Sequence, residues 1–70
     1  MESFGVQLLA DRFVIEPQEN GTFRVMEGEQ KLGVVYPEPG ENGVEWKTMD
    51  ELDVNFVAQI GELISEHNQS

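Results

Sequence analysis

Cysteine is absent from this sequence, so neither a disulfide bond nor a thiolate metal site can form. Nothing therefore indicates an oxidising compartment. Basic residues are also scarce, because four Lys and Arg stand against fourteen Asp and Glu, for a formal net charge of -10. A chain of this charge repels phosphates and anionic lipid. We therefore expect no direct nucleic-acid binding and no membrane association.

Long hydrophobic runs are missing as well. The longest apolar runs, such as residues 13–15 and 34–36, are far shorter than the roughly 18 residues that span a bilayer. The N-terminal residues lack the basic region and apolar core of a signal peptide, so we expect a cytoplasmic protein. With 70 residues in all, we predict a single small globular domain over residues 1–66 and a frayed tail over residues 67–70.

Residues that could carry catalysis are few. The single histidine, His67, lies near the C-terminus, where it suits the negative end of a helix dipole. The serines and threonines stand in no nucleophile motif, and the glycines form no phosphate-binding fingerprint. We therefore expect no catalytic residues, no bound cofactor and no enzymatic activity. A small enzyme or enzyme subunit is the third alternative.

The acidic residues do not have the spacing of a calcium site. If Asp53 began an EF-hand loop, Asn55 would fit the third position, but Ala58 would replace the glycine and Ile64 the final glutamate. Zinc would require several Cys or His ligands, which the chain does not have. We expect no metal site.

Two Asn-Gly pairs mark tight turns, at residues 20–21 and 42–43. Segments rich in β-branched and aromatic residues surround them and predict strands at 13–16, 22–26, 31–36 and 44–48. Two prolines between residues 37 and 43 predict a loop there. Residues 4–8 fit either a strand or a helical turn; we favour a strand, joined to the next by a tight turn or bulge at residues 10–12.

After residue 48 the hydrophobic period changes to that of a helix. One stripe contains Met49, Leu52, Phe56, Ile60, Leu63 and His67, flanked by Val57 and Ile64. Thr48 and Glu51 have the spacing of a capping box, which places the start of the helix there. Ala58 and Gly61 are small enough to allow close packing, either on the sheet or on a second subunit.

These elements predict an α+β fold, an antiparallel β-meander of four to five strands with one C-terminal amphipathic helix packed on one face. The face toward the helix should carry Phe13, Ile15, Phe23, Val25, Leu32, Val34, Tyr36, Val44 and Trp46. The outer face should carry Val14, Glu16, Thr22, Arg24, Met26, Gly33, Val35, Glu45 and Lys47.

The acidic charge is concentrated in one segment. The candidate partner-binding residues are Glu38, Glu41, Glu45, Asp50, Glu51 and Asp53, with Lys47 as the one base among them. An alternative surface is the outer sheet face at Val14, Met26 and Val35. We predict a small acidic non-enzymatic protein-interaction module whose partner is another protein, with a basic surface as one option. A nucleic-acid mimic that occupies the basic site of a DNA-binding protein is the alternative, and a homodimer is left open.

Overall fold

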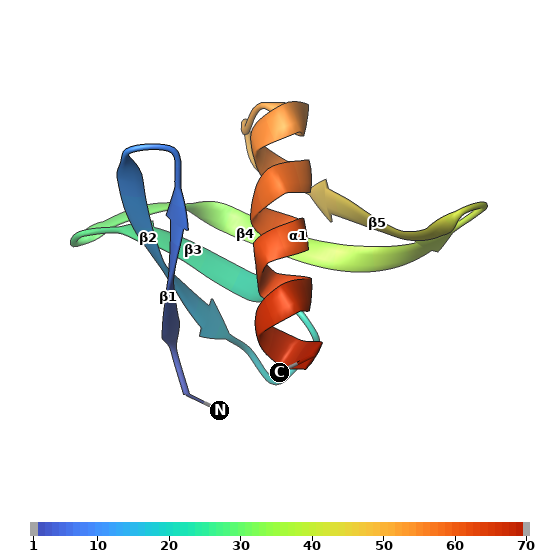
Figure 1. Cartoon of the computed structure of the whole chain (residues 1–70), viewed down its shortest axis with the longest axis horizontal. Helices are drawn as coiled ribbons and strands as arrows, with labels where there is room; N and C mark the ends of the chain where they lie inside the picture. Colours follow the sequence, from blue (N-terminus) through green and yellow to red (C-terminus); the bar gives the residue numbers. More distant parts are fainter. Residues whose placement is uncertain (1, 70) are drawn as a thin grey trace.

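The computed structural model describes residues 2–69, which form a five-stranded antiparallel sheet and one helix (Figure 1). The elements are β1 (Phe4–Leu8), β2 (Asp11–Pro17), β3 (Phe23–Glu27), β4 (Gln30–Gly40), β5 (Gly43–Thr48) and α1 (Val54–Gln69). The strands follow one another across the sheet in chain order, so the sheet is a meander. The predicted α+β class and the C-terminal helix are confirmed.

The N-terminal segment is a strand, as favoured from its alternation. β1 pairs with β2 so that Phe4 lies opposite Ile15 and Val6 opposite Phe13. The connection is the tight turn at Leu9 and Ala10, because Leu8 already pairs with Asp11. This turn brings the hydrophobic residues of both strands onto a common face.

The predicted hairpin around Asn20 and Gly21 is also confirmed. Gly21 adopts a φ of 83°, which L-residues rarely tolerate, and the Gln18 amide donates to the Thr22 carbonyl at 2.9 Å. In the following turn, Glu27 pairs with Gln30, and Gly28 adopts a φ of 61°. Glycine at the first central position is typical of a two-residue hairpin turn.

The loop predicted over residues 37–43 is wrong. β4 continues through Pro37 and Pro39 to Gly40, and β5 begins at Gly43. The connection is therefore only the turn at residues 41–42. The result is a long β4–β5 hairpin that reaches well beyond the helix (Figure 1).

The prolines are tolerated because one side of β4 has no partner there. Pro37 lies opposite Trp46, and Pro39 opposite Val44, while β3 pairs with β4 only as far as Val35. A strand accepts proline where the missing N–H would not have served the ladder. Both prolines occupy alternate positions, so both nitrogens face the side that β3 has already left. The sequence rule failed because it treated the whole of β4 as a central strand.

A bulge in β4 overturns part of the predicted face assignment. Val25 lies opposite Gly33 and Met26 opposite Lys31, so Leu32 is an extra residue in β4. The extra residue changes the alternation, and Gly33 and Val35 point toward the helix. Val34 and Tyr36 consequently lie on the outer face, in the reverse of the predicted arrangement. The alternation of inward and outward residues along a single strand could not reveal this shift, because the bulge depends on the pairing with β3.

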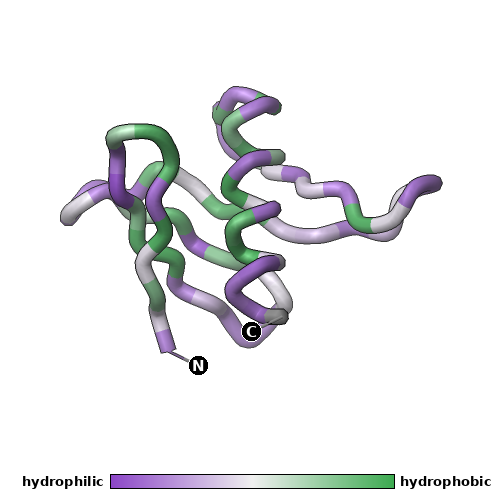
Figure 2. Tube along the Cα trace, in the orientation of Figure 1, coloured by the Kyte–Doolittle hydropathy of each residue, from purple (hydrophilic) through white to green (hydrophobic). Residues whose placement is uncertain are grey.

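The core lies between the sheet and α1. Its buried residues are Phe13, Ile15, Val25, Val35, Val57, Ile60 and Ile64. Figure 2 shows hydrophobic segments along the strands and the helix, whereas the end of the β4–β5 hairpin is mostly hydrophilic. The predicted helix stripe is confirmed at Phe56, Ile60 and Ile64, whereas Leu63 is half-buried and Met49 is 90% exposed and precedes the helix.

The helix begins later than the predicted capping box. Its first residue is Val54, and the Asp53 carboxylate accepts hydrogen bonds from the amides of Asn55 at 3.1 Å and Phe56 at 3.2 Å. Asp53 is therefore the N-cap. The Thr48 hydroxyl instead donates to the Val34 carbonyl at 2.7 Å, at the end of β5. At the other end, α1 continues past residue 66 to Gln69, and Ser70 lies outside the described residues.

Candidate functional site

The structure separates the six candidate acids into two groups, one on the β4–β5 hairpin and one between β5 and α1. Glu38, Glu41 and Glu45 lie on the projecting part of the β4–β5 hairpin, residues 37–45, which we call the acidic arm. All three side chains are exposed. The same nine-residue segment contains no Lys or Arg. The arm is therefore a small, uniformly negative surface that stands away from the core (Figure 1).

Two of the arm's carboxylates come from directly opposed residues. Glu38 pairs with Glu45 across the β4–β5 ladder, so their side chains leave the same face of the sheet. Glu45 lies over Gly40, because a Cβ at Gly40 would stand only 2.6 Å from the Cγ of Glu45. The absence of a side chain at residue 40 thus makes room for this carboxylate along the arm.

Two of the acids nearer the helix form hydrogen bonds that stabilise the fold. Asp50 accepts a hydrogen bond from the Val34 amide at 2.8 Å, and Asp53 caps α1. Glu51 lies between them and is exposed. The six residues consequently do not form one surface, and only the three on the arm are exposed together without a structural contact that we identify.

The alternative surface on the outer sheet face is only partly as predicted. Val14 and Met26 are direct cross-strand neighbours, and Val14 is 37% exposed. Val35 is fully buried on the opposite face, because the β4 bulge turned it inward. No apolar patch of the predicted composition therefore exists within residues 2–69.

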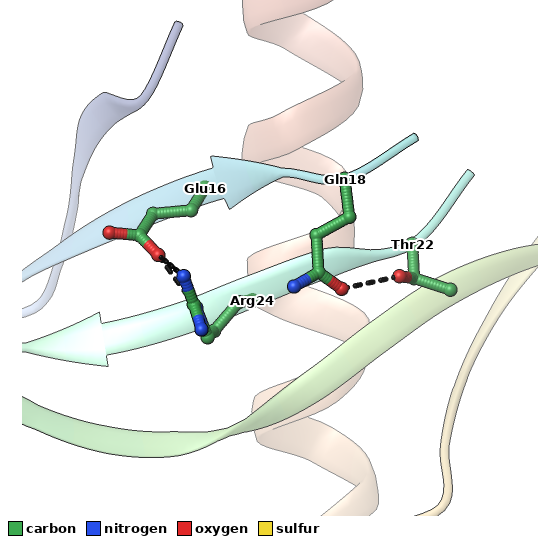
Figure 3. A network of polar contacts seen from close by, with 4 residues as sticks. All are labelled: Glu16, Gln18, Thr22 and Arg24. Atoms are coloured by element: carbon green, nitrogen blue, oxygen red, sulfur yellow. Dashed lines mark hydrogen bonds and ion pairs between the residues drawn. The ribbon is translucent and has the colours of Figure 1, made fainter. Parts of the chain in front are cut away.

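Polar contacts cover the middle of that outer face. Arg24 of β3 forms an ion pair with Glu16 of β2, and the Thr22 hydroxyl donates to the Gln18 side chain at 2.8 Å (Figure 3). Both members of the ion pair are partly exposed, so it contributes about 0–1 kcal/mol. These contacts favour a solvated sheet surface over an interface there.

A groove between β5 and α1 is the feature that sequence reasoning missed. It encloses about 470 Å³, and its apolar lining comes from Val44, Trp46, Val54, Val57 and Ala58. Val44 is 63% exposed, although it was expected on the sheet face that the helix covers, and Val54 is 77% exposed. No local sequence signal marks this groove, because it depends on where α1 packs beside β5.

The helix side of this groove confirms one predicted close contact. A Cβ at Gly61 would lie 2.0 Å from the Cγ of Trp46, so the indole ring packs directly on the helix backbone. Trp46 also contacts Phe23, with ring centroids 5.7 Å apart. Gly61 therefore serves packing on the sheet, whereas Ala58 stays exposed beside the groove.

Chemistry-bearing residues are not gathered into a reactive centre in the described part of the chain. His67 stacks on Phe4, with ring centroids 3.7 Å apart and planes 5° from parallel. Among residues 2–69, no group of three or more His, Cys, Asp and Glu side chains has the arrangement needed to hold a metal ion. The arm and the groove are the two surface features that stand out in this part of the chain.

Comparisons with known proteins find no relative: no family model matches the chain, and no curated protein or solved structure is significantly similar to it. Within residues 2–69, no helix combines the length and apolar character that crossing a membrane requires.

Proposed function

We propose that this chain is a small, non-enzymatic protein-interaction module that binds a basic surface of another protein through the acidic arm. The observation that carries the proposal is the direct pairing of Glu38 with Glu45 on an exposed hairpin. Like charges directly opposite each other destabilise an antiparallel sheet. A basic partner relieves this repulsion. The free energy that the repulsion costs the unbound domain is then regained on binding.

Mimicry of a nucleic acid is a weaker explanation of the same charge. A mimic needs a continuous row of carboxylates in place of phosphates. Asp50 and Asp53 accept hydrogen bonds from backbone amides, and they lie away from the three acids of the arm. The division of the acids therefore supports an interaction module with a local basic contact.

The test is the triple variant Glu38→Gln, Glu41→Gln and Glu45→Gln, with a lysine-rich peptide as the basic probe. We expect slower association with the peptide, because complementary charge acts chiefly on the association rate. Its unfolding free energy should equal or slightly exceed that of the parent, since the Glu38–Glu45 repulsion is gone. Stopped-flow mixing and urea unfolding measure the two quantities.

The matched control is Glu2→Gln, Glu19→Gln and Glu29→Gln, which removes the same charge from other exposed positions. If both triple variants slow association equally, the peptide senses only net charge and the arm is not the binding surface. A titration with salt then tests whether charge carries the binding. A contact through the arm's carboxylates must lose affinity as salt rises, whereas an apolar contact responds little.

A further inference from the structure

The outer edge of β5 has no neighbouring strand. The sheet ends at β5, whose pairing with β4 runs without a register shift from Gly43 to Thr48. β5 itself contains no proline. Natural sheets guard such an edge with a proline, a bulge, a very short strand or charged side chains, because its free amides and carbonyls pair readily with another strand. The charged residues of β5 are Glu45 and Lys47, whose opposite charges suit an antiparallel copy of the same strand. The edge of β5 is thus able to accept a further strand.

The pairing with β4 shows which backbone amides and carbonyls of β5 point to the free edge. The Val34 amide and carbonyl both bond to side chains at the end of β5, so they point toward that strand. Backbone groups alternate in direction along a strand, so those of Pro37 and Pro39 point away from β5. Trp46 and Val44, which lie opposite them, are therefore in non-hydrogen-bonded pairs with β4. Their amides and carbonyls consequently point to the free edge.

These outward-pointing backbone groups permit a symmetric pairing with a second copy of the chain. Two β5 strands can run antiparallel about a two-fold axis, with the two Trp46 residues as a hydrogen-bonded pair. In that register Glu45 lies opposite Lys47 of the second copy, and Lys47 lies opposite Glu45 of the second copy. An axis at Val44 would place Glu45 opposite Gly43 and would lose both ion pairs.

We infer that the chain forms a homodimer through antiparallel β5–β5 pairing centred on Trp46, held by two reciprocal Glu45–Lys47 ion pairs. The inference goes beyond the proposed function, because it concerns the free edge of β5 and a second copy of the chain, with Glu45 as the one acid that belongs to both surfaces. It also gives a use to Lys47, the only base among the acids between residues 38 and 53. The incoming lysine offsets the repulsion between Glu45 and Glu38.

Apolar surface beside the edge supports the same occupant. Val44 and Val54 line the groove between β5 and α1, and they are 63% and 77% exposed. In the proposed register Val44 lies opposite Thr48 of the second copy, which lines that copy's own groove. The exposed valines of both copies are then covered together. Ala58 is a small exposed residue on the helix side of the groove, and it leaves room for the second copy to approach.

The net charge of -10 on each copy opposes association, so the measurement belongs at physiological ionic strength. The Debye length is then about 8 Å, which screens distant charges more than the directly opposed pairs. Sedimentation equilibrium over a wide concentration range measures the dimer dissociation constant. We compare the parent with Glu45→Lys, with Lys47→Glu and with the double variant that carries both changes.

Each single change converts both ion pairs into like-charge pairs, so we expect dimerisation to weaken roughly tenfold or more. The double variant exchanges the charges and should dimerise like the parent. The most discriminating sample mixes the two single variants. One then carries two lysines and the other two glutamates at these positions, so a mixed dimer regains both ion pairs although neither variant dimerises well alone.

Controls of equal charge change are Glu19→Lys and Lys31→Glu, both at exposed positions away from β5. They should dimerise like the parent. A parent that stays monomeric at every concentration overturns the inference. So does a dimer that survives the single changes at residues 45 and 47, because it must use another surface. Glu38 and Glu41 belong to the acidic arm but lie outside β5, so the effect of Glu38→Gln and Glu41→Gln on peptide binding tests the proposed function separately from this inference.

Discussion

The carboxylate of Asp50 accepts a hydrogen bond from the backbone amide of Val34 at 2.8 Å. Val34 belongs to β4, and Asp50 follows the last residue of β5, Thr48, by two positions. The Thr48 hydroxyl donates to the carbonyl of the same Val34 at 2.7 Å, and accepts from the Asp50 amide at 3.1 Å. Two side chains thus complete the ladder where the strand itself stops.

Replacing Asp50 should therefore weaken the domain. Asp50→Ala removes the acceptor for the Val34 amide, and we expect a loss of about 1 kcal/mol of unfolding free energy because the bond is exposed. Asp50→Asn keeps an acceptor oxygen and should lose less. Urea unfolding followed by the fluorescence of Trp46, the only tryptophan, measures both.

The neighbouring Glu51→Ala is the control, because Glu51 is exposed and makes no backbone contact that we identify. It should leave stability unchanged. Equal losses at residues 50 and 51 would mean that the Val34 contact contributes nothing specific.

Replacing Gly61 with alanine should destabilise the domain, although Gly→Ala usually stabilises a helix. In an exposed helix interior, Gly→Ala stabilises by about 1 kcal/mol through propensity. Here the added methyl would overlap the Trp46 ring, so Gly61→Ala should instead destabilise by about 3 kcal/mol. Thermal unfolding gives the sign directly. Combining Gly61→Ala with Trp46→Ala should remove the penalty of the methyl group, whereas a stabilising single change would disprove the contact.

Leu9 occupies a conformation that costs stability. Its φ is 57°, in the left-handed region, and its side chain is 86% exposed, so no burial offsets the strain. Leu9→Gly should stabilise by about 0.5–1 kcal/mol, because glycine enters this region without a steric penalty. The matched change Ala10→Gly should not stabilise, since Ala10 does not adopt a positive φ. A destabilised Leu9→Gly protein would show that the leucine side chain makes a favourable contact.

The helix–sheet contact can be tested at two adjacent residues. Ile60 is fully buried, so Ile60→Ala should cost about 2–5 kcal/mol and, in a domain this small, prevent stable folding. Gln59 points to solvent, and Gln59→Ala should change little. Circular dichroism against temperature compares the two. Similar melting temperatures would contradict the packing of α1 on the sheet.

Local signals in the sequence determined the class of fold and most of the element types. The Asn-Gly turns set the hairpins, and the change of hydrophobic period at the C-terminus marked the helix. The three acids of the arm were also found from sequence, since charge needs no structure to be counted. These features depend on residues close together in the chain, which is why sequence patterns report them.

Only the tertiary structure decided what depends on neighbouring strands. Pro37 and Pro39 are acceptable in β4 because β3 has ended, and a linear sequence does not show where a neighbouring strand ends. The extra residue at Leu32 reversed which β4 side chains face the helix, through a pairing shift that no propensity encodes. The groove beside β5 exists because the packing of Trp46 on Gly61 holds α1 at that distance from the sheet edge.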